Sequence, residues 1–433
     1  MTSTDARTVP ADEQSTQRLK DAGYDYRIVD MADLTASTGF ARATERGFLG
    51  SEPGSAELVD LRTTWTDRRN VGVYEQDAAD EALPVGTVNA WVADLTVPGG
   101  TLPMWAISMV TVSAVHRRRG VARNLLEGEL RAAAAAGVPM AGLTVTEATI
   151  YGRYGFGPAI SVSKVAIDTR NAGWRAPAGT GRLEYVDRGR LSVELGIVHD
   201  RARLARTGQI PGWERRWHGL SGIEADGAKP DAAVRGVHYL DEHGELRGAM
   251  SFSLKELPNS HRHLLTVRHL AAETDDALRA LWGFVVNHDL VDRAEAGLRP
   301  VDDPLPHLVA DQRCVEVTVH DHGWLRILDV PAALRARRWD GPLDAVLRVI
   351  DAYGFADGTW RVQVDAAGAA SVEETTADAA VTLGVAELST VYAGGVPLSQ
   401  LAAAGRVQGD ADAIAALSRA LRTDPAPFLG IWY

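Results

Sequence analysis

The segment VTVSAVHRRRGVARNLLEGEL, residues 110–130, contains the pattern that decides the fold. It begins at the end of a β-rich run, Leu102 to Val112, and changes to helical period over Arg118 to Ala136. Between the two lies a basic loop that contains Gly120. Unpaired N–H groups and the positive end of the helix dipole meet at such a start, and glycine lets the backbone approach a phosphate. The segment therefore predicts an anion site, although a basic triplet alone is usually only a solvated turn.

The neighbouring segments complete one α/β unit. A second β-rich run, Val85 to Val97, is joined to the first through 98–101, which predicts an antiparallel hairpin. After the helix, Gly137 and Pro139 act as stop signals, and a strand is expected at Met140 to Val145. The helical face consists of Val121, Leu125, Leu126, Leu130, Ala133 and Ala134.

Two further segments of the chain repeat the mixture of strands and helices. Strands are predicted at 183–186, 236–240, 249–254 and 264–270, with a helix at 275–286. From about Val315 onward, strands are predicted at 324–328, 345–349, 359–364 and 380–383, and helices at 385–392 and 411–422. A chain of 433 residues is long enough for two or three domains.

Composition excludes several classes of protein. The net charge of −12 disfavours a general nucleic-acid binder and favours cationic small molecules. No apolar run approaches the roughly 20 residues needed to span a bilayer, so no membrane insertion is expected. The polar first twenty residues lack a secretory signal and predict a flexible tail, and the single cysteine, Cys314, fits a reducing compartment such as the cytoplasm. The histidines lack metal-binding spacing, so no metal site is predicted.

Two motifs carry a family resemblance. The spacing Arg117-x-x-Gly120-x-Ala122 resembles the acyl-CoA signature of the GNAT superfamily of N-acetyltransferases. The longer stretch TEATIYGRYGFGP, residues 146–158, resembles a motif of the enhanced intracellular survival (Eis) acetyltransferases. Counterparts of the segments at 303–308, 324–327 and 330–334 extend this resemblance over nearly the whole chain.

The resemblance implies an α/β (α+β) multidomain fold with two tandem GNAT folds and a C-terminal sterol-carrier-like α+β domain. After a flexible tail at 1–24, it places the catalytic domain at 25–163, a second domain without cofactor at 164–314 and the sterol-carrier-like domain at 315–433. It also implies a homo-oligomer, a hexamer in the resembling family. The second domain lacks both glycine and basic residues at its helix start, Ala271 to Thr274, and so offers no phosphate cradle.

The resemblance further implies acetyl-CoA as co-substrate. The expected contacts comprise the strand end Val110, Thr111 and Val112, the loop and helix start Arg117, Arg118, Arg119, Gly120, Val121, Ala122 and Arg123, and the motif residues Thr146 and Glu147.

Two proton-handling groups are expected, because amide formation needs a neutral amine and a proton for the departing thiolate. Tyr151 aligns with the family's proton donor; taken alone, it would be interpreted as a packing aromatic. The apolar terminus, ending at Tyr433, should be docked, and the resemblance makes its α-carboxylate the proton acceptor. Taken alone, that carboxylate could equally face solvent.

The expected acceptor is a primary amine on a small molecule of aminoglycoside or polyamine type, or a lysine side chain. Aminoglycoside preference is in doubt, because Trp432 stands where the mycobacterial members carry an acidic residue. Two alternatives stay open: a lipid or sterol carrier, since the helices at 388–404 could line an apolar cavity, and a non-catalytic assembly scaffold.

Overall fold

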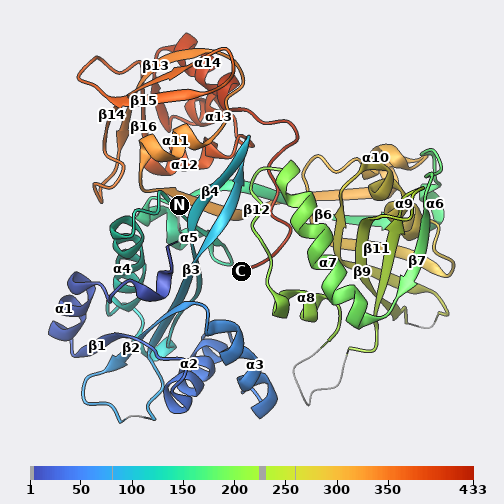
Figure 1. Ribbon diagram of the computed structural model, residues 1–433, viewed down its shortest axis with the longest axis horizontal. Helices are drawn as coiled ribbons and strands as arrows, with labels where there is room; N and C mark the ends of the chain where they lie inside the picture. Colours follow the sequence, from blue (N-terminus) through green and yellow to red (C-terminus); the bar gives the residue numbers. More distant parts are fainter. Residues whose placement is uncertain (1–3, 80, 224–230, 259) are drawn as a thin grey trace. The chain divides into compact units, whose positions relative to one another are not determined.

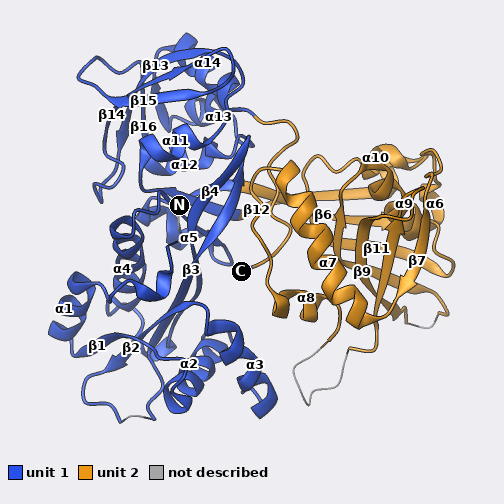
Figure 2. Ribbon diagram, viewed as in Figure 1, with its two compact units in different colours: residues 1–159, 323–422, 433 blue, residues 160–322, 423–432 orange. Residues whose placement is uncertain are grey.

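The computed structural model describes residues 4–79, 81–223, 231–258 and 260–433. The chain forms two compact units (Figure 2). Unit 1 comprises residues 1–159, 323–422 and 433, and unit 2 comprises residues 160–322 and 423–432. No helix among the described residues is both long and apolar enough to cross a membrane.

The first part of unit 1 is a twisted sheet covered by helices (Figure 1). Its strands are β1 (Tyr24–Ile28), β2 (Arg69–Glu75), β3 (Gly86–Val97), β4 (Gly100–Val112) and β5 (Met140–Thr144), in this spatial order, and residues 323–327 of β12 (Val315–Ile327) pair with β5. The helices are α1 (Glu13–Asp21), α2 (Leu34–Gly47), α3 (Ser55–Trp65), α4 (Val121–Ala135) and the short α5 (Ala148–Tyr151).

Apolar residues on both sides of this sheet explain its stability. Leu125, Leu126 and Leu130 of α4 are buried against Val88 and Trp105 of the sheet. A second cluster joins Phe40 of α2 with Leu61 and Trp65 of α3. The predicted hairpin is confirmed, because Val97 pairs with Gly100 across a two-residue turn in which Gly99 has φ +83°. The predicted amphipathic helix is confirmed as α4.

The expectation of a flexible N-terminal tail is wrong for the described residues before β1. Helix α1 begins with Asp12 capping Ser15, and Arg131 of α4 forms an ion pair with Asp12 at 2.8 Å. Arg69 donates hydrogen bonds to the carbonyls of Val9 and Pro10. Its guanidinium is held in turn by the buried carboxylate of Glu129 at 3.0 Å. Polar composition misled the prediction, because these polar groups are partners of buried charges rather than solvated ones.

The second part of unit 1 has its own five-stranded sheet, in the order β15-β14-β13-β16-β17. The strands are β13 (Leu343–Ile350), β14 (Gly358–Val364), β15 (Ala370–Glu374), β16 (Val381–Gly384) and β17 (Val407–Gly409). The helices are α11 (Val330–Ala336), α12 (Val385–Tyr392), α13 (Leu398–Ala403) and α14 (Ala411–Leu421). Buried Arg337 donates to the carbonyls of Tyr392 and Leu421, the last residues of α12 and α14. It thereby satisfies carbonyls that helix ends leave without partners.

The strands of unit 2 follow one another in the order β6-β11-β10-β9-β8-β7, in which β10 and β11 are parallel and the other pairs are antiparallel. Its strands are β6 (Gly157–Asp168), β7 (Arg182–Val186), β8 (Val234–Leu240), β9 (Leu246–Glu256), β10 (His263–Ala272) and β11 (Val291–Arg299). The helices are α6 (Thr169–Ala172), α7 (Arg188–Ala202), α8 (Glu214–Leu220), α9 (Asp275–Val286) and α10 (Leu305–Leu308). Leu281, Trp282 and Val285 of α9 are buried with Phe252 and Leu265 of the sheet.

One buried ion pair ties the two parts of unit 1 together. Arg326 of β12 and Asp351, which follows β13, are nearly inaccessible to solvent and meet at 2.7 Å through both carboxylate oxygens. The same guanidinium donates to the carbonyl of Tyr154 at 3.0 Å. Removing one member of such a pair leaves a buried charge without compensation.

We therefore predict that Asp351→Ala lowers the free energy of unfolding of unit 1 by about 3 kcal/mol or more. The matched control is Asp344→Ala, which removes a carboxylate from the exposed Asp344–Arg361 pair and should leave stability close to that of the wild type. Chemical denaturation followed by circular dichroism measures both. Equal unfolding midpoints for the two variants would contradict the assigned importance of the buried pair.

Candidate functional site

The candidate site begins where two parallel strands of unit 1 separate. β4 and β5 pair only from Met104–Met140 to Ala106–Gly142. β5 ends two residues later, at Thr144, whereas β4 continues to Val112. Opposite β3, a bulge between the pairs Thr87–Thr111 and Asn89–Ser108 turns β4 further, and Met109 there has φ +53°. The edge of β4 beyond Ala106 therefore faces a split instead of a strand.

The loop after β4 leads directly into a helix start with free donors. The first hydrogen bond of α4 runs from the N–H of Asn124 to the carbonyl of Gly120 at 3.0 Å. The N–H groups of the three preceding residues, Val121, Ala122 and Arg123, thus have no partner within the helix. Gly120 is left-handed with φ +82°, and Arg118 is also left-handed with φ +63°. Such successive turns aim backbone N–H groups at a common point, where an anion can bind.

The arginines of this loop divide into two groups. Arg119 donates to the hydroxyl of Tyr24 at 3.2 Å, and Arg123 forms an ion pair with Glu127 at 2.6 Å. Arg117 and Arg118 are exposed, and no acidic partner is found for either among the residues that the structure describes. Two cations are therefore available at the helix start.

Tyr151 lies at the end of α5, just after the loop that follows β5. Its ring is half-buried and meets the buried ring of Phe156 edge to face, with the ring centres 6.2 Å apart. Burial raises the pKa of the Tyr151 hydroxyl above its ordinary value, and nearby Tyr154 and Glu147 add to the shift. The phenol thus keeps its proton at neutral pH. Thr146 and Glu147 precede α5 and are exposed.

The last residue of the chain belongs to unit 1 and lies at the end of β5. The Thr144 hydroxyl donates to a terminal carboxylate oxygen of Tyr433, and it also accepts the Tyr433 N–H at 3.2 Å. The Tyr433 ring packs edge to face on Trp91, with the ring centres 5.5 Å apart. The guanidinium of Arg68 lies over the same Trp91 ring, 3.8 Å from its centre. The terminus is therefore docked, as its apolar character predicted.

The structure thus places three of the predicted groups at the ends of the two strands that separate. The loop 117–123 starts the helix after β4, while Tyr151 and Tyr433 lie beside the end of β5. Sequence reasoning missed Thr144, Trp91 and Arg68. Thr144 ends an ordinary strand, and nothing in its local pattern predicts a partner 289 residues away.

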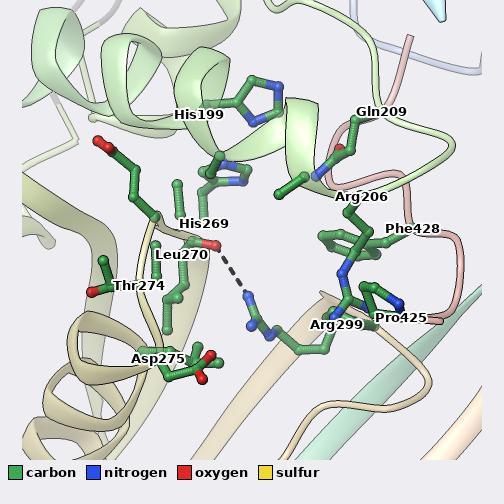
Figure 3. A pocket seen from close by; sticks show the side chains of 17 residues that line it. His199, Arg206, Gln209, His269, Leu270, Thr274, Asp275, Arg299, Pro425 and Phe428 are labelled. Carbon is green, nitrogen blue, oxygen red and sulfur yellow. Dashed lines mark hydrogen bonds between the residues drawn. The ribbon is translucent and has the colours of Figure 1, made fainter. Parts of the chain in front are cut away.

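Unit 2 contains a comparable pair of strands, but there the split is closed. β10 and β11 pair from His263–Val291 to Val267–Ala296, and β10 carries its own irregularity between Val267 and His269. Beyond this point Arg299 of β11 donates to the carbonyl of Leu270 at 3.1 Å, as the dashed line in Figure 3 shows. The carboxylate of Asp303 holds the same guanidinium at 2.7 Å. A side chain of the protein thus spans the separation.

The helix that follows β10 is also unsuited to a phosphate. α9 starts with Asp275 and Asp276, and its N-cap Thr274 accepts the hydrogen bond of Ala277. Acidic side chains at a helix N-terminus repel anions. A cavity of about 250 Å³ remains beside Leu270, Thr274 and Arg299 (Figure 3).

No group of three or more histidine, cysteine or acidic residues that could hold a metal ion occurs within the described part of the chain. Its single cysteine, Cys314, is partly exposed and unbridged.

Comparisons with known proteins assign each part of the chain to a domain family. Residues 30–159 and 208–327 each match an acetyltransferase (GNAT) domain, and residues 330–430 match a sterol carrier protein domain. An uncharacterized N-acetyltransferase of Streptomyces avermitilis is 35% identical over 398 residues, covering 89% of this chain and 94% of that protein. N-acetyltransferase Eis of Mycobacterium tuberculosis is 32% identical over 317 residues, covering 70% of this chain and 73% of Eis.

A solved structure extends the similarity to the whole fold. Eis1 from Mycobacterium abscessus superimposes with a TM-score of 0.78 at 30% identity, over 94% of this chain and all of that one. GNAT acetyltransferases use acetyl-CoA as co-substrate. The chain therefore belongs to the Eis-like N-acetyltransferases of the GNAT superfamily, with two GNAT domains followed by a sterol carrier protein domain.

Proposed function

We propose that unit 1 transfers the acetyl group of acetyl-CoA directly to a primary amine, with acetyl-CoA bound in the split between β4 and β5. One observation carries this proposal. The edge of β4 that β5 leaves unpaired is followed in the chain by a helix start at which the N–H groups of Val121 to Arg123 are free. In the proposed complex the pantetheine amides form hydrogen bonds with the backbone of Val110, Thr111 and Val112. The N–H groups and the side chains of Arg117 and Arg118 bind the pyrophosphate.

Two groups handle the protons in this proposal. The terminal carboxylate of Tyr433, held by Thr144, accepts a proton from the attacking amine. The Tyr151 hydroxyl donates a proton to the departing thiolate as the C–S bond breaks and the C–N bond forms. A phenol whose pKa is raised by burial is protonated at neutral pH, which suits a donor. Acetyl-CoA supplies the activated thioester, and the protein supplies position and proton transfer.

The proposed acceptor is a small molecule with one or more primary amines, of polyamine or aminoglycoside type, or a lysine side chain. The net charge of −12 favours cationic acceptors at long range. Trp432 occupies the position before the terminus, where it packs on His322 with ring centres 4.4 Å apart and supplies no carboxylate to a polycation. We therefore propose polyamines and lysine side chains as acceptors in preference to aminoglycosides.

We propose three further properties on the basis of the family resemblance. The domains extend over 25–163, 164–314 and 315–433, the chain assembles as a homohexamer, and it acts in the cytoplasm. The exposed apolar side chains Val317 and Val319 of β12 support a contact with another copy.

The first prediction from the proposed function concerns the phosphate cradle. The double variant Arg117→Gln/Arg118→Gln should raise the Kd for acetyl-CoA about tenfold or more, because charge-assisted hydrogen bonds to phosphate are lost. Isothermal titration calorimetry measures this affinity. S-acetylpantetheine, which lacks the pyrophosphate, serves as the control and should be turned over equally by variant and wild type. An equal loss with both donors would place the arginines outside the phosphate contact.

The second prediction concerns Tyr151. Tyr151→Phe should keep the affinity for acetyl-CoA but lower kcat by roughly 10²- to 10⁴-fold, since the proton for the thiolate is lost. Tyr154→Phe is the matched control: it makes the same chemical change on a neighbouring, buried ring and should remain active. Release of free CoA in the presence of a polyamine follows the reaction. Wild-type turnover in Tyr151→Phe would show that this ring only packs.

The third prediction concerns the end of the chain. Adding two glycines after Tyr433 should abolish acetylation, because the extension converts the carboxylate into an amide and removes the proton acceptor. Binding of acetyl-CoA and the unfolding temperature should stay near the wild-type values. The same two glycines before Met1 are the control and should be tolerated. A fully active C-terminal extension would mean that another group or a water relay accepts the proton.

A further inference from the structure

The terminal segment 423–432 of unit 2 has no regular secondary structure, although Phe428, Leu429, Gly430 and Ile431 are buried. A buried backbone of this kind needs partners for its polar groups. Unit 2 supplies a hydrogen-bond acceptor for the N–H group of every second residue from Ala426 to Gly430. Asp302 accepts the N–H of Ala426 at 2.8 Å, the Thr207 carbonyl accepts that of Phe428 at 2.8 Å, and the Gln209 side chain accepts that of Gly430 at 2.9 Å.

The last contact in this series comes from His322, which is fully buried. Its Nε2 atom lies 3.1 Å from the carbonyl of Ile431, and since a carbonyl can only accept, Nε2 carries the proton. Trp432 packs edge to face on the same imidazole, at 4.4 Å between ring centres. Burial lowers the pKa of His322 to about 4, so this donor stays neutral and fixed in the normal pH range.

The terminal segment runs beside the end of β10 and the start of α9, where the second GNAT fold would be expected to bind a cofactor. Pro425 and Phe428 line the cavity in Figure 3 together with Leu270, Thr274 and Arg299. Gln209 also lines this cavity, and Arg299 closes the split between the strands. Unit 2 thus uses the region beside its diverging strands to hold the chain's own terminus.

We propose that unit 2 is a holder for the terminal segment, and that Gln209 and His322 are positioning residues for the carboxylate of Tyr433. Trp432 is bonded to Tyr433, whose Cα lies only about 3.8 Å further along the chain, so fixing Ile431 and Trp432 limits where the carboxylate can be. The role of that carboxylate rests on the proposed function. The holding of the segment does not, and it can be tested without any acetylation.

The experiment uses a metallocarboxypeptidase that removes aromatic C-terminal residues, applied to the native full-length protein. The loss of Tyr433 is timed by intact mass. His322→Phe keeps a ring but removes the donor, so Tyr433 should be released about tenfold faster, as expected from one lost hydrogen bond. His322→Gln places an amide N–H near the position of Nε2 and should restore slow release. His243→Phe, at an exposed histidine of unit 2, is the matched control and should behave as the wild type.

Acetylation is measured on the same variants. In His322→Phe, kcat should fall while the KM for acetyl-CoA is unchanged, and His322→Gln should recover activity. Gln209→Leu and Gln209→Glu form a second pair, because only glutamate keeps an acceptor for the N–H of Gly430. Wild-type release of Tyr433 from both His322→Phe and Gln209→Leu would overturn the holder proposal. Faster release with undiminished acetylation would leave the holder in place and contradict the carboxylate's role in catalysis.

Discussion

The divergence of two parallel strands is the constraint on which the rest of unit 1 depends. Because β4 and β5 pair through only three residue pairs, the edge of β4 that faces β5 must find other partners beyond Ala106, whereas its opposite edge stays paired with β3. The helix between the strands starts at the opening of that split, and Thr144 and Tyr151 lie at or just beyond the end of the shorter strand. The groups that we propose to bind acetyl-CoA and to transfer protons thus all depend on a single feature of the backbone.

Unit 2 shows how the same topology can lose this capacity. Arg299 joins the separated strands through the Leu270 carbonyl, and Asp303 neutralises the charge that this buries. The helix start carries Thr274, Asp275 and Asp276 where the start of α4 carries glycine and basic residues. On our proposal, groups of the chain itself thus occupy the region where unit 1 would bind an external ligand. One GNAT fold can then serve as a catalytic domain and another as a structural support.

Much of this could be predicted from sequence, and the failures have physical causes. Strong periodicity predicted the β3–β4 hairpin, α4 and α9. β6 was missed because glycines and aromatics at its start indicated a loop. Helix α1 was missed because its stabilising partners, Arg131 and Asn124, are more than 100 residues distant. At the site, the motif residues were predicted, but Thr144 and Arg299 act through contacts that no local pattern encodes.

The hydrogen bonds between Thr144 and Tyr433 also bear on when the protein becomes complete during synthesis. They join residues 289 positions apart, so both partners are present only after the intervening chain has been synthesised. At a synthesis rate of roughly 5–20 residues per second, Tyr433 is added roughly 15 to 60 seconds after Thr144. On the proposed mechanism, a nascent chain therefore holds no competent catalytic centre until Tyr433 has left the ribosome and reached Thr144.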